Sequence, residues 1–521
     1  MIRSPAILRS SRGRRRALSD FLGSPVGGWN TRDPLDRMAA SDAVVLENWF
    51  PRPGSVDLRG GYEPHVTGFE SSPQLLMTWA GTTSSKLFAV TPSYIYDVTV
   101  SGVLGASAMA VTSSNFSYTN FETPAGNFLV AVNGADSLKL FDGSTWSSIT
   151  DTGAISITGQ ATNTLNSVVS LHRRLWFTKN GSKSAYYLPA AQVGGALSEF
   201  PLGQVFTRGG YLVAIAAWSS DPDAGQNDYT VFISSEGEVA LYSGTDPADA
   251  ATFQKIGVLF IAPPVAGHRC TARLGGDLLI LCRLGLFRLS QVLSAKSDTT
   301  SQLALTDKIN SAFTRAVASY ASNTHWQVIS YPQEQALLVN IPITDGYSEQ
   351  YVMNTLTGAW ARFVGWFGQN FCVRDGKLYS AGSSRVDLTW VGTSDNGSAI
   401  KGRMQSAYNY FGARGFLKQI KLISPNVQTT AAVTGSLGVD VDFQMLGLAD
   451  IAVVNPPEGA RWDEETWDNA YWAGDFTLSS GWVSPICPEG FAHSVIYRLE
   501  TRLASVKLLG FNISGEKGGS M

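Results

Sequence analysis

The stretch 127–149, NFLVAVNGADSLKLFDGSTWSSI, decides the expected fold. It consists of an apolar strand, a polar Asn-Gly turn and a second strand, and Asn-Gly readily takes the positive-φ positions that a tight hairpin needs. The first strand is apolar almost throughout, which is typical of a strand covered on both faces. The stretch therefore predicts a small antiparallel sheet packed between neighbouring sheets.

The same pattern recurs along most of the chain. Seven such stretches follow one another at intervals of roughly 40 to 60 residues, beginning near Leu87, Phe128, Leu175, Val231, Leu278, Leu337 and Leu378. One small sheet cannot bury both of its faces, so recurrent sheets of this kind pack side by side around an axis. We therefore expect an all-β fold with a β-propeller of six to seven blades over residues 70–397.

The flanking segments have other patterns. Residues 1–24 form a basic, Ser-rich arm without hydrophobic periodicity, expected to be disordered in the free chain. Residues 25–69 are expected to be extended, with a short helix from Asp42 to Asn48 for which Asp42 or Ser41 offers a cap, and with a strand near Val56 that closes the last blade. Residues 398–521 contain longer strands and predict a C-terminal β-sandwich-like domain.

Composition limits the possible partners. The chain has 521 residues, of which 16% are charged, and a net charge of −3, so its body gives no electrostatic reason to bind nucleic acid or an anionic membrane. No run of eighteen apolar residues exists, which argues against a membrane span. The four cysteines lack metal-ligand spacing and predict buried free thiols of a protein assembled in a reducing cytoplasm: Cys270, Cys282, Cys372 and Cys487.

Motifs of catalysis are absent from the sequence. Its five histidines are isolated from other ligand types, and it has no phosphate-binding loop, nucleophile elbow or dinucleotide fingerprint. We expect no catalytic residue, no metal and no cofactor. The segment DGSTW at 142–146 matches only the end of the Asp-box motif of sialidases, and a hairpin turn accounts for it.

Two clusters are candidate contact sites. Arg12, Arg14, Arg15 and Arg16 in the arm could contact DNA or an acidic partner, or could form a solvated tail. Aromatic residues interleaved with acids predict either a packed loop or a subunit interface. The candidate interface residues are Trp462, Trp467, Tyr471 and Trp472, together with Trp49 and Phe50.

Several segments, in their order along the chain, resemble one protein family. They are GWNTRDPL at 28–35, DAVVLENWFPRPGSVDLRGGY at 42–62 and YTVFISSEGEVALYSGTDPADAATFQKIGV at 229–258. The sequence is similar here to the tail nozzle proteins of short-tailed bacteriophages (tubular protein B) and to the related hub proteins that stabilise packaged DNA.

The resemblance implies a structural, non-enzymatic virion protein assembled in the host cytoplasm. Six copies would form a ring beneath the portal and adaptor, contact other tail proteins, and enclose a conduit through which double-stranded DNA passes without sequence specificity. A slightly acidic body suits a conduit, because each phosphate contact would have to be broken during passage. The alternative is a carbohydrate-binding or glycan-cleaving propeller that recognises a host receptor.

Overall fold

The computed structural model describes residues 16–219, 228–294, 304–344, 346–454, 477–479 and 481–520. The chain divides into two compact units. The propeller unit comprises Gly60–Gly358 and Phe363–Asn396, and the sandwich unit comprises the residues up to Arg59, Ala359–Arg362 and those from Gly397 onward. Strands dominate both units, which confirms the predicted all-β class.

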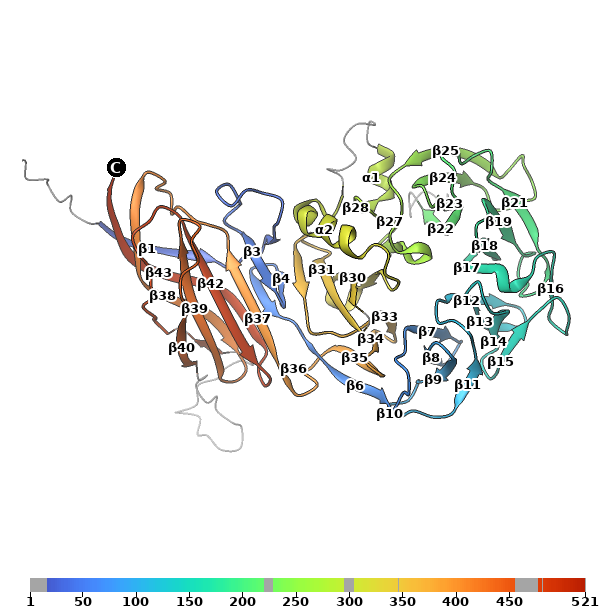
Figure 1. Cartoon of the computed structure of the whole chain (residues 1–521), viewed down its shortest axis with the longest axis horizontal. Coiled ribbons are helices and arrows are strands. Elements are labelled where there is room, and N and C mark those ends of the chain that lie inside the picture. Colours follow the sequence, from blue (N-terminus) through green and yellow to red (C-terminus); the bar gives the residue numbers. More distant parts are fainter. Residues whose placement is uncertain are drawn as a thin grey trace, which may run out of the picture. The chain divides into compact units, whose positions relative to one another are not determined.

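The first four blades of the propeller are four-stranded antiparallel sheets (Figure 1). Blade 1 contains β7 (Leu75–Ala80), β8 (Ser85–Val90), β9 (Tyr94–Asp97) and β11 (Ser107–Ala110). Blade 2 contains β12 (Ser117–Thr123), β13 (Gly126–Val132), β14 (Leu138–Phe141) and β15 (Trp146–Ile149). Blade 3 contains β17 (Leu165–Leu171), β18 (Arg174–Lys179), β19 (Ser184–Tyr187) and β21 (Ser198–Pro201). Blade 4 contains β22 (Leu212–Ser219), β23 (Asp228–Ser234), β24 (Glu238–Ser243) and β25 (Gln254–Phe260).

Three further sheets complete the described part of the propeller. Blade 5 contains β26 (Thr271–Leu274), β27 (Asp277–Cys282) and β28 (Gly285–Arg288). Blade 6 contains β29 (Gln327–Tyr331), β30 (Ala336–Thr344) and β31 (Tyr347–Asn354). Blade 7 contains β33 (Asn370–Arg374), β34 (Lys377–Gly382), β35 (Arg385–Val391) and, from earlier in the chain, β6 (Gly61–Thr67). The prediction of six to seven blades is confirmed, with seven among the described residues.

Contacts between the innermost strands close the ring. The innermost strands β7, β12, β17 and β22 contact one another in chain order, β22 contacts β27 of blade 5, β26, β29 and β33 contact one another in chain order, and β33 contacts β7. The Asn133-Gly134 turn has the conformation expected from the sequence, since Gly134 has positive φ, and Gly237 and Gly376 have positive φ in the turns of two other hairpins. Apolar clusters fill the spaces between blades; the one shared by blades 4 and 5 includes Val231 and Ile280, both almost fully buried.

Short strand pairs, 3-10 turns and two helices accompany the blades. The short pairs are β16 (Ile157–Thr158) with β20 (Gly195–Ala196), and β10 (Gly102–Val103) and β36 (Ser394–Asp395) with β6. The 3-10 turns are η1 (Thr162–Thr164), η2 (Gly267–Arg269), η4 (Asp307–Ile309) and η5 (Pro332–Glu334). Two helices, α1 (Leu289–Ser294) and α2 (Asn310–Tyr320), contact the three-stranded blade 5. In α2, Phe313, Ala316 and Val317 are buried at helical spacing.

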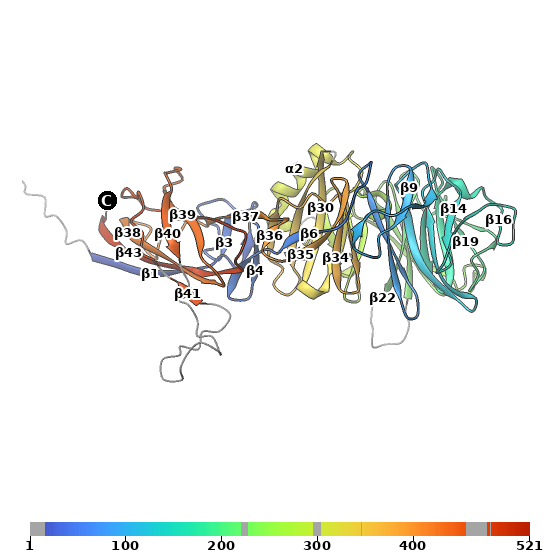
Figure 2. The same ribbon diagram turned by 90° about the horizontal axis from the view of Figure 1, so that it is seen from below.

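The sandwich unit contains two sheets (Figure 2). The first contains β1 (Arg16–Gly23), β4 (Trp49–Arg52), β5 (Ser55–Leu58), β43 (Val506–Ser520), β38 (Phe416–Thr429) and β41 (Thr477–Ser479). The second contains β2 (Gly28–Trp29), β3 (Asp42–Glu47), β32 (Trp360–Phe363), β37 (Ser398–Ser406), β42 (His493–Thr501), β39 (Val433–Val441) and β40 (Ala449–Val454). The Tyr497 ring of β42 lies 6.1 Å from that of Trp49 and 5.9 Å from that of Phe511. Aromatic side chains of both sheets thus form the core of the predicted sandwich.

The helix expected at Asp42–Asn48 is wrong, because this segment is strand β3. It pairs with β37, with Ala43 opposite Ser406 and Glu47 opposite Arg403. The adjacent β-branched residues Val44 and Val45 favour an extended chain. Pairing with a strand more than 300 residues away decides the conformation, and a local capping pattern does not reveal such pairing.

The expected boundaries of the N-terminal segments also need correction. Disorder through residue 24 is wrong for Arg16–Gly23, because this segment forms β1 and pairs along β43 (Figure 2). The strand near Val56 does not close the propeller, since β5 pairs with β4 and β43 in the sandwich unit. The closing strand is β6, which follows Gly60, and segment 25–69 therefore divides between the two units at Arg59.

Candidate functional site

The ring closure is the first candidate site. Strand β6 pairs antiparallel with β35, from Arg385 opposite Thr67 to Val391 opposite Gly61, and the chain then continues into β7 of blade 1. Blade 7 is thus assembled from the two ends of the propeller unit. We call the junction of blade 7 with blade 1 the seam; its apolar core includes Val66, Leu87 and Val386, all buried.

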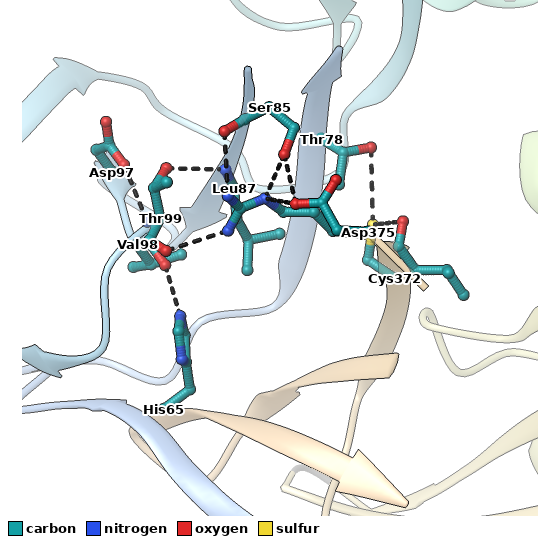
Figure 3. A network of polar contacts seen from close by, with 11 residues as sticks. His65, Thr78, Ser85, Leu87, Asp97, Val98, Thr99, Cys372 and Asp375 are labelled. Carbon is teal, nitrogen blue, oxygen red and sulfur yellow. Dashed lines mark hydrogen bonds and ion pairs between the residues drawn. The ribbon is translucent and has the colours of Figure 1, made fainter. Parts of the chain in front are cut away.

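A polar network also links blade 7 to blade 1 at the seam (Figure 3). Arg374, at the end of β33, donates from Nε to Ser85 Oγ at 2.8 Å and from Nη2 to the Ser85 carbonyl oxygen at 3.1 Å. Its Nη1 donates to the carbonyl oxygen of Thr99 at 3.1 Å. The Ser85 hydroxyl donates in turn to Asp375 at 2.7 Å. One guanidinium of blade 7 thereby holds two segments of blade 1 in a defined register.

His65 of the closing strand adds a further bond. Its Nε2 lies 2.9 Å from the carbonyl oxygen of Val98 in blade 1. A carbonyl can only accept, so Nε2 carries the proton and donates. Burial lowers the pKa of His65, and the cation of Arg374 acts in the same direction. The neutral imidazole therefore serves as a structural donor.

A buried thiol and a part-buried phenol lie close together beside the seam. The Tyr118 hydroxyl of β12 lies 3.5 Å from Cys372 Sγ of β33, and Cys372 Sγ lies 4.0 Å from Thr78 Oγ1 of β7. Burial raises the pKa of both Tyr118 and Cys372, so both stay protonated near neutral pH. All four cysteines are buried and free, as predicted from their scattered spacing.

The second candidate site is a cavity on the propeller axis. It has a volume of about 210 Å³ and is lined by innermost strands and the residues that precede them, among them Leu76, Ser117, Val168 and Gln327. Arg269 of η2, which precedes β26 of blade 5, also lines it. Its Nη2 donates to Asn115 Oδ1 at 3.1 Å and lies 3.5 Å from the carbonyl oxygen of Phe116, just before β12 of blade 2. A cationic side chain therefore crosses the axis.

The charge states in this cavity follow from burial. Burial lowers the pKa of His268 to about 3, and neighbouring Arg269 adds to the effect, so this imidazole is neutral near pH 7. Burial also lowers the pKa of Arg269 to about 10, which leaves the guanidinium charged. The lining residues described are otherwise uncharged, and the cavity has one permanent charge.

The sequence-predicted contact residues do not come together. Trp49 and Phe50 are 0% and 1% exposed in the sandwich core, so the prediction that they lie at a subunit interface is wrong. The Trp49 indole packs against Gly402 of β37, where a side chain would clash with it. Arg16 lies exposed at the start of β1, opposite Lys517. Arg12, Arg14 and Arg15, and Trp462, Trp467, Tyr471 and Trp472, lie outside the described residues.

Sequence reasoning did not single out Arg269, Arg374 or His65. Each acts through residues distant in the sequence, so no local spacing could have found it. Across the described ranges, no group of three or more His, Cys, Asp or Glu side chains is arranged to hold a metal ion. The helices of the described part are too short or too polar to cross a membrane.

Comparison with known proteins yields distant propellers. No family model and no curated protein matches the sequence. Among solved structures, the chain is similar to the Cps50 (Swd1) β-propeller domain of Myceliophthora thermophila, with 13% identity, 62% of this chain and 99% of that chain covered, and a TM-score of 0.37. YCF48 bound to D1 peptide matches at 10% identity, with 64% and 97% coverage and a TM-score of 0.37.

An exo-β-1,3-galactanase from Phanerochaete chrysosporium matches at 9% identity, covering 76% of this chain and 95% of that chain, with a TM-score of 0.26. Similarity at this distance assigns no activity. The propeller architecture is established by the order of its sheets and the closure of its ring.

Proposed function

We propose that this chain is a structural subunit of a ring-shaped assembly, the tail nozzle or hub of a short-tailed bacteriophage, which retains the genome and releases it. The sequence resemblance supplies the family. The observation that supports a mechanical role is the seam, where β6 closes the ring and Arg374 ties blade 7 to blade 1 through three hydrogen bonds. A wall that must keep its shape under internal pressure benefits from such directional bonds.

The axial cavity favours a conduit between subunits over one through the propeller. Its volume of about 210 Å³ is far too small for a DNA duplex, and Arg269 crosses it. In the proposed assembly, DNA passes through the centre of a ring of six copies, in contact with their outer surfaces. The portal, the adaptor and other tail proteins are the proposed neighbours of this ring in the virion.

The character of the cavity also supports a structural role over glycan cleavage. Glycoside hydrolysis commonly uses a pair of carboxyl groups flanking the scissile bond. The described lining instead combines the Arg269 cation with amide, hydroxyl and apolar groups. A glycan-binding propeller remains the competing function, and the experiment below separates the two.

The test is the assembly state of the purified full-length chain, alone and with its portal and adaptor. We expect closed six-membered rings by native mass spectrometry and negative-stain microscopy, and no release of sugar from glycan substrates. A chain that stays monomeric with portal and adaptor present, and that binds or cleaves glycans, would contradict the proposal.

The basic arm is tested by charge removal. Deleting residues 1–24 would also remove β1 from its sheet, whereas Arg→Gln substitution at Arg12, Arg14, Arg15 and Arg16 leaves the strand in place. We expect unchanged thermal unfolding with impaired assembly or DNA retention. Intact, DNA-filled particles from this variant would show that the arm is a solvated tail.

A further inference from the structure

The axial cavity contains an unneutralised cation. Within the described residues, Arg269 makes no ion pair, and its hydrogen bonds are those of Nη2 to Asn115 Oδ1 and the Phe116 carbonyl oxygen. Nε and Nη1 have no hydrogen-bond acceptor there. The guanidinium is only partly exposed and has no counterion among these residues, so an anion that enters the cavity can pair with its charge and accept from Nε and Nη1.

The polar side chains near Arg269 already form hydrogen bonds with one another or with the backbone. Asn370 Nδ2 donates to Gln327 Oε1 at 3.0 Å, and Gln327 Nε2 donates to the Phe371 carbonyl oxygen at 2.8 Å. Ser117 Oγ accepts from the Val168 amide at 3.1 Å. These hydrogen bonds hold the wall in place, and free hydrogen-bonding capacity is left on the guanidinium and on His268 Nε2, which is buried without a partner among the described residues.

The dimensions of the cavity select a small ligand. Since one water molecule occupies about 30 Å³ of liquid, a volume of about 210 Å³ holds an ion with a few waters and excludes an oligosaccharide. A planar guanidinium with free donors matches two oxygens of a carboxylate or phosphate. Arg269 reaches from blade 5 to blade 2, so an anion bound to it would link opposite sides of the ring.

We propose that the axial cavity is a binding site for one small oxyanion, a phosphate- or carboxylate-type group held by Arg269. The site is independent of the proposed function, because it is formed within a single propeller. The bound ion neutralises the guanidinium and stabilises the propeller against unfolding.

The test is a titration of the full chain with inorganic phosphate and, separately, with acetate, at constant ionic strength set by chloride. We expect a saturable rise in the unfolding temperature with at least one of these ions, and phosphate binding is also followed by ³¹P line broadening. Arg269→Gln should weaken binding at least tenfold. Arg283→Gln, at an exposed position in the β27–β28 turn of the same blade, is the matched control and should leave it unchanged.

A second variant, Arg269→Lys, keeps the proposal testable if Arg269→Gln does not fold. It keeps the positive charge but loses the planar pair of donors. It should bind more weakly than the wild-type chain and more tightly than Arg269→Gln. The proposal is overturned if neither ion binds the wild-type chain, or if Arg269→Gln binds them as tightly as wild type does.

Discussion

The seam between blades 7 and 1 has more directional contacts than the junction between blades 4 and 5. The blade 4–5 junction is an apolar cluster that includes Phe287, crossed by one side-chain hydrogen bond, from Trp218 Nε1 to Asp277 at 3.2 Å. The seam has an apolar core as well, but Arg374 and His65 add hydrogen bonds across it. Apolar burial is non-directional, so the junction that must position a strand from the start of the unit against strands from its end carries additional, directional contacts.

The largest expected effect is at the apolar junction. Phe287 is 0% exposed, and Phe287→Ala should lower the free energy of unfolding of the propeller by about 3–5 kcal/mol, because it removes buried surface and leaves a cavity. Phe287→Leu, which keeps most of the volume, should cost less than about 1.5 kcal/mol. Chemical denaturation followed by tryptophan fluorescence measures both; equal losses would show that packing does not dominate this junction.

A pH experiment extends the comparison to the sandwich unit, where His493 is fully buried. Burial and the nearby Lys418 cation lower its pKa from 6.5 to about 4. Between those values the unfolded chain takes up a proton that the folded chain excludes, so stability is retained above pH 6.5 and lost as the pH falls to 4. The loss should reach at most about 3 kcal/mol.

His493→Phe should remove this part of the pH dependence. Thermal unfolding of both proteins between pH 7 and pH 4 measures it, with the unfolding of the sandwich followed separately from that of the propeller. Parallel pH profiles for the two proteins would exclude His493 as the titrating group.

The seam itself is tested at Arg374, whose side chain is 13% exposed. Arg374→Met should cost about 2 kcal/mol, because the carbonyl oxygens of Ser85 and Thr99 lose a charged donor. Arg374→Lys should recover only part of this, since one ammonium cannot replace the planar set of donors. Hydrogen exchange of β6 and β7 locates the effect. Unchanged protection in Arg374→Met would mean that the network adds nothing to the apolar core of the seam.

The smallest effect is expected at the partly exposed ion pair of blade 1. Lys86 Nζ lies 3.3 Å from Asp97, with side-chain exposures of 32% and 39%. Lys86→Gln should change the free energy of unfolding by about 0.5 kcal/mol or less. A loss as large as that of Arg374→Met would show that charge alone, rather than burial and donor geometry, sets the strength of seam contacts.

The blades could be predicted from the sequence because each is a local unit. The residues of a hairpin such as Val130 and Leu140 lie close together in the chain, so alternation and turn residues report the pairing directly. The same reasoning failed at Asp42–Glu47 and at Arg16–Gly23, whose partners lie hundreds of residues away. Their local sequences, one with a capping pattern and one basic, contain no signal of those partners.

The candidate sites were harder to predict from the sequence than the strand pairings were. Arg374 and Arg269 are single arginines with no motif around them, and their roles arise only when the ring brings Ser85 or Asn115 within reach. Trp49 and Phe50 illustrate the opposite case, in which residues that the sequence did single out have another role. They were expected at a subunit interface and lie instead in the core of the sandwich unit. Composition shows that large side chains must be covered, but it does not show by what.

The pairing of β1 with β43 has a consequence during synthesis on the ribosome. The whole propeller unit lies between Arg59 and Gly397, so all of its blades emerge while β1 and β5 still lack β43 and β3 still lacks β37. The strand edges that pair with these late strands must stay open through the translation of more than three hundred residues, and exposed strand edges are sites of mispairing. A chain truncated after Asn396 should therefore contain a propeller that can close its ring, attached to an N-terminal segment that tends to aggregate.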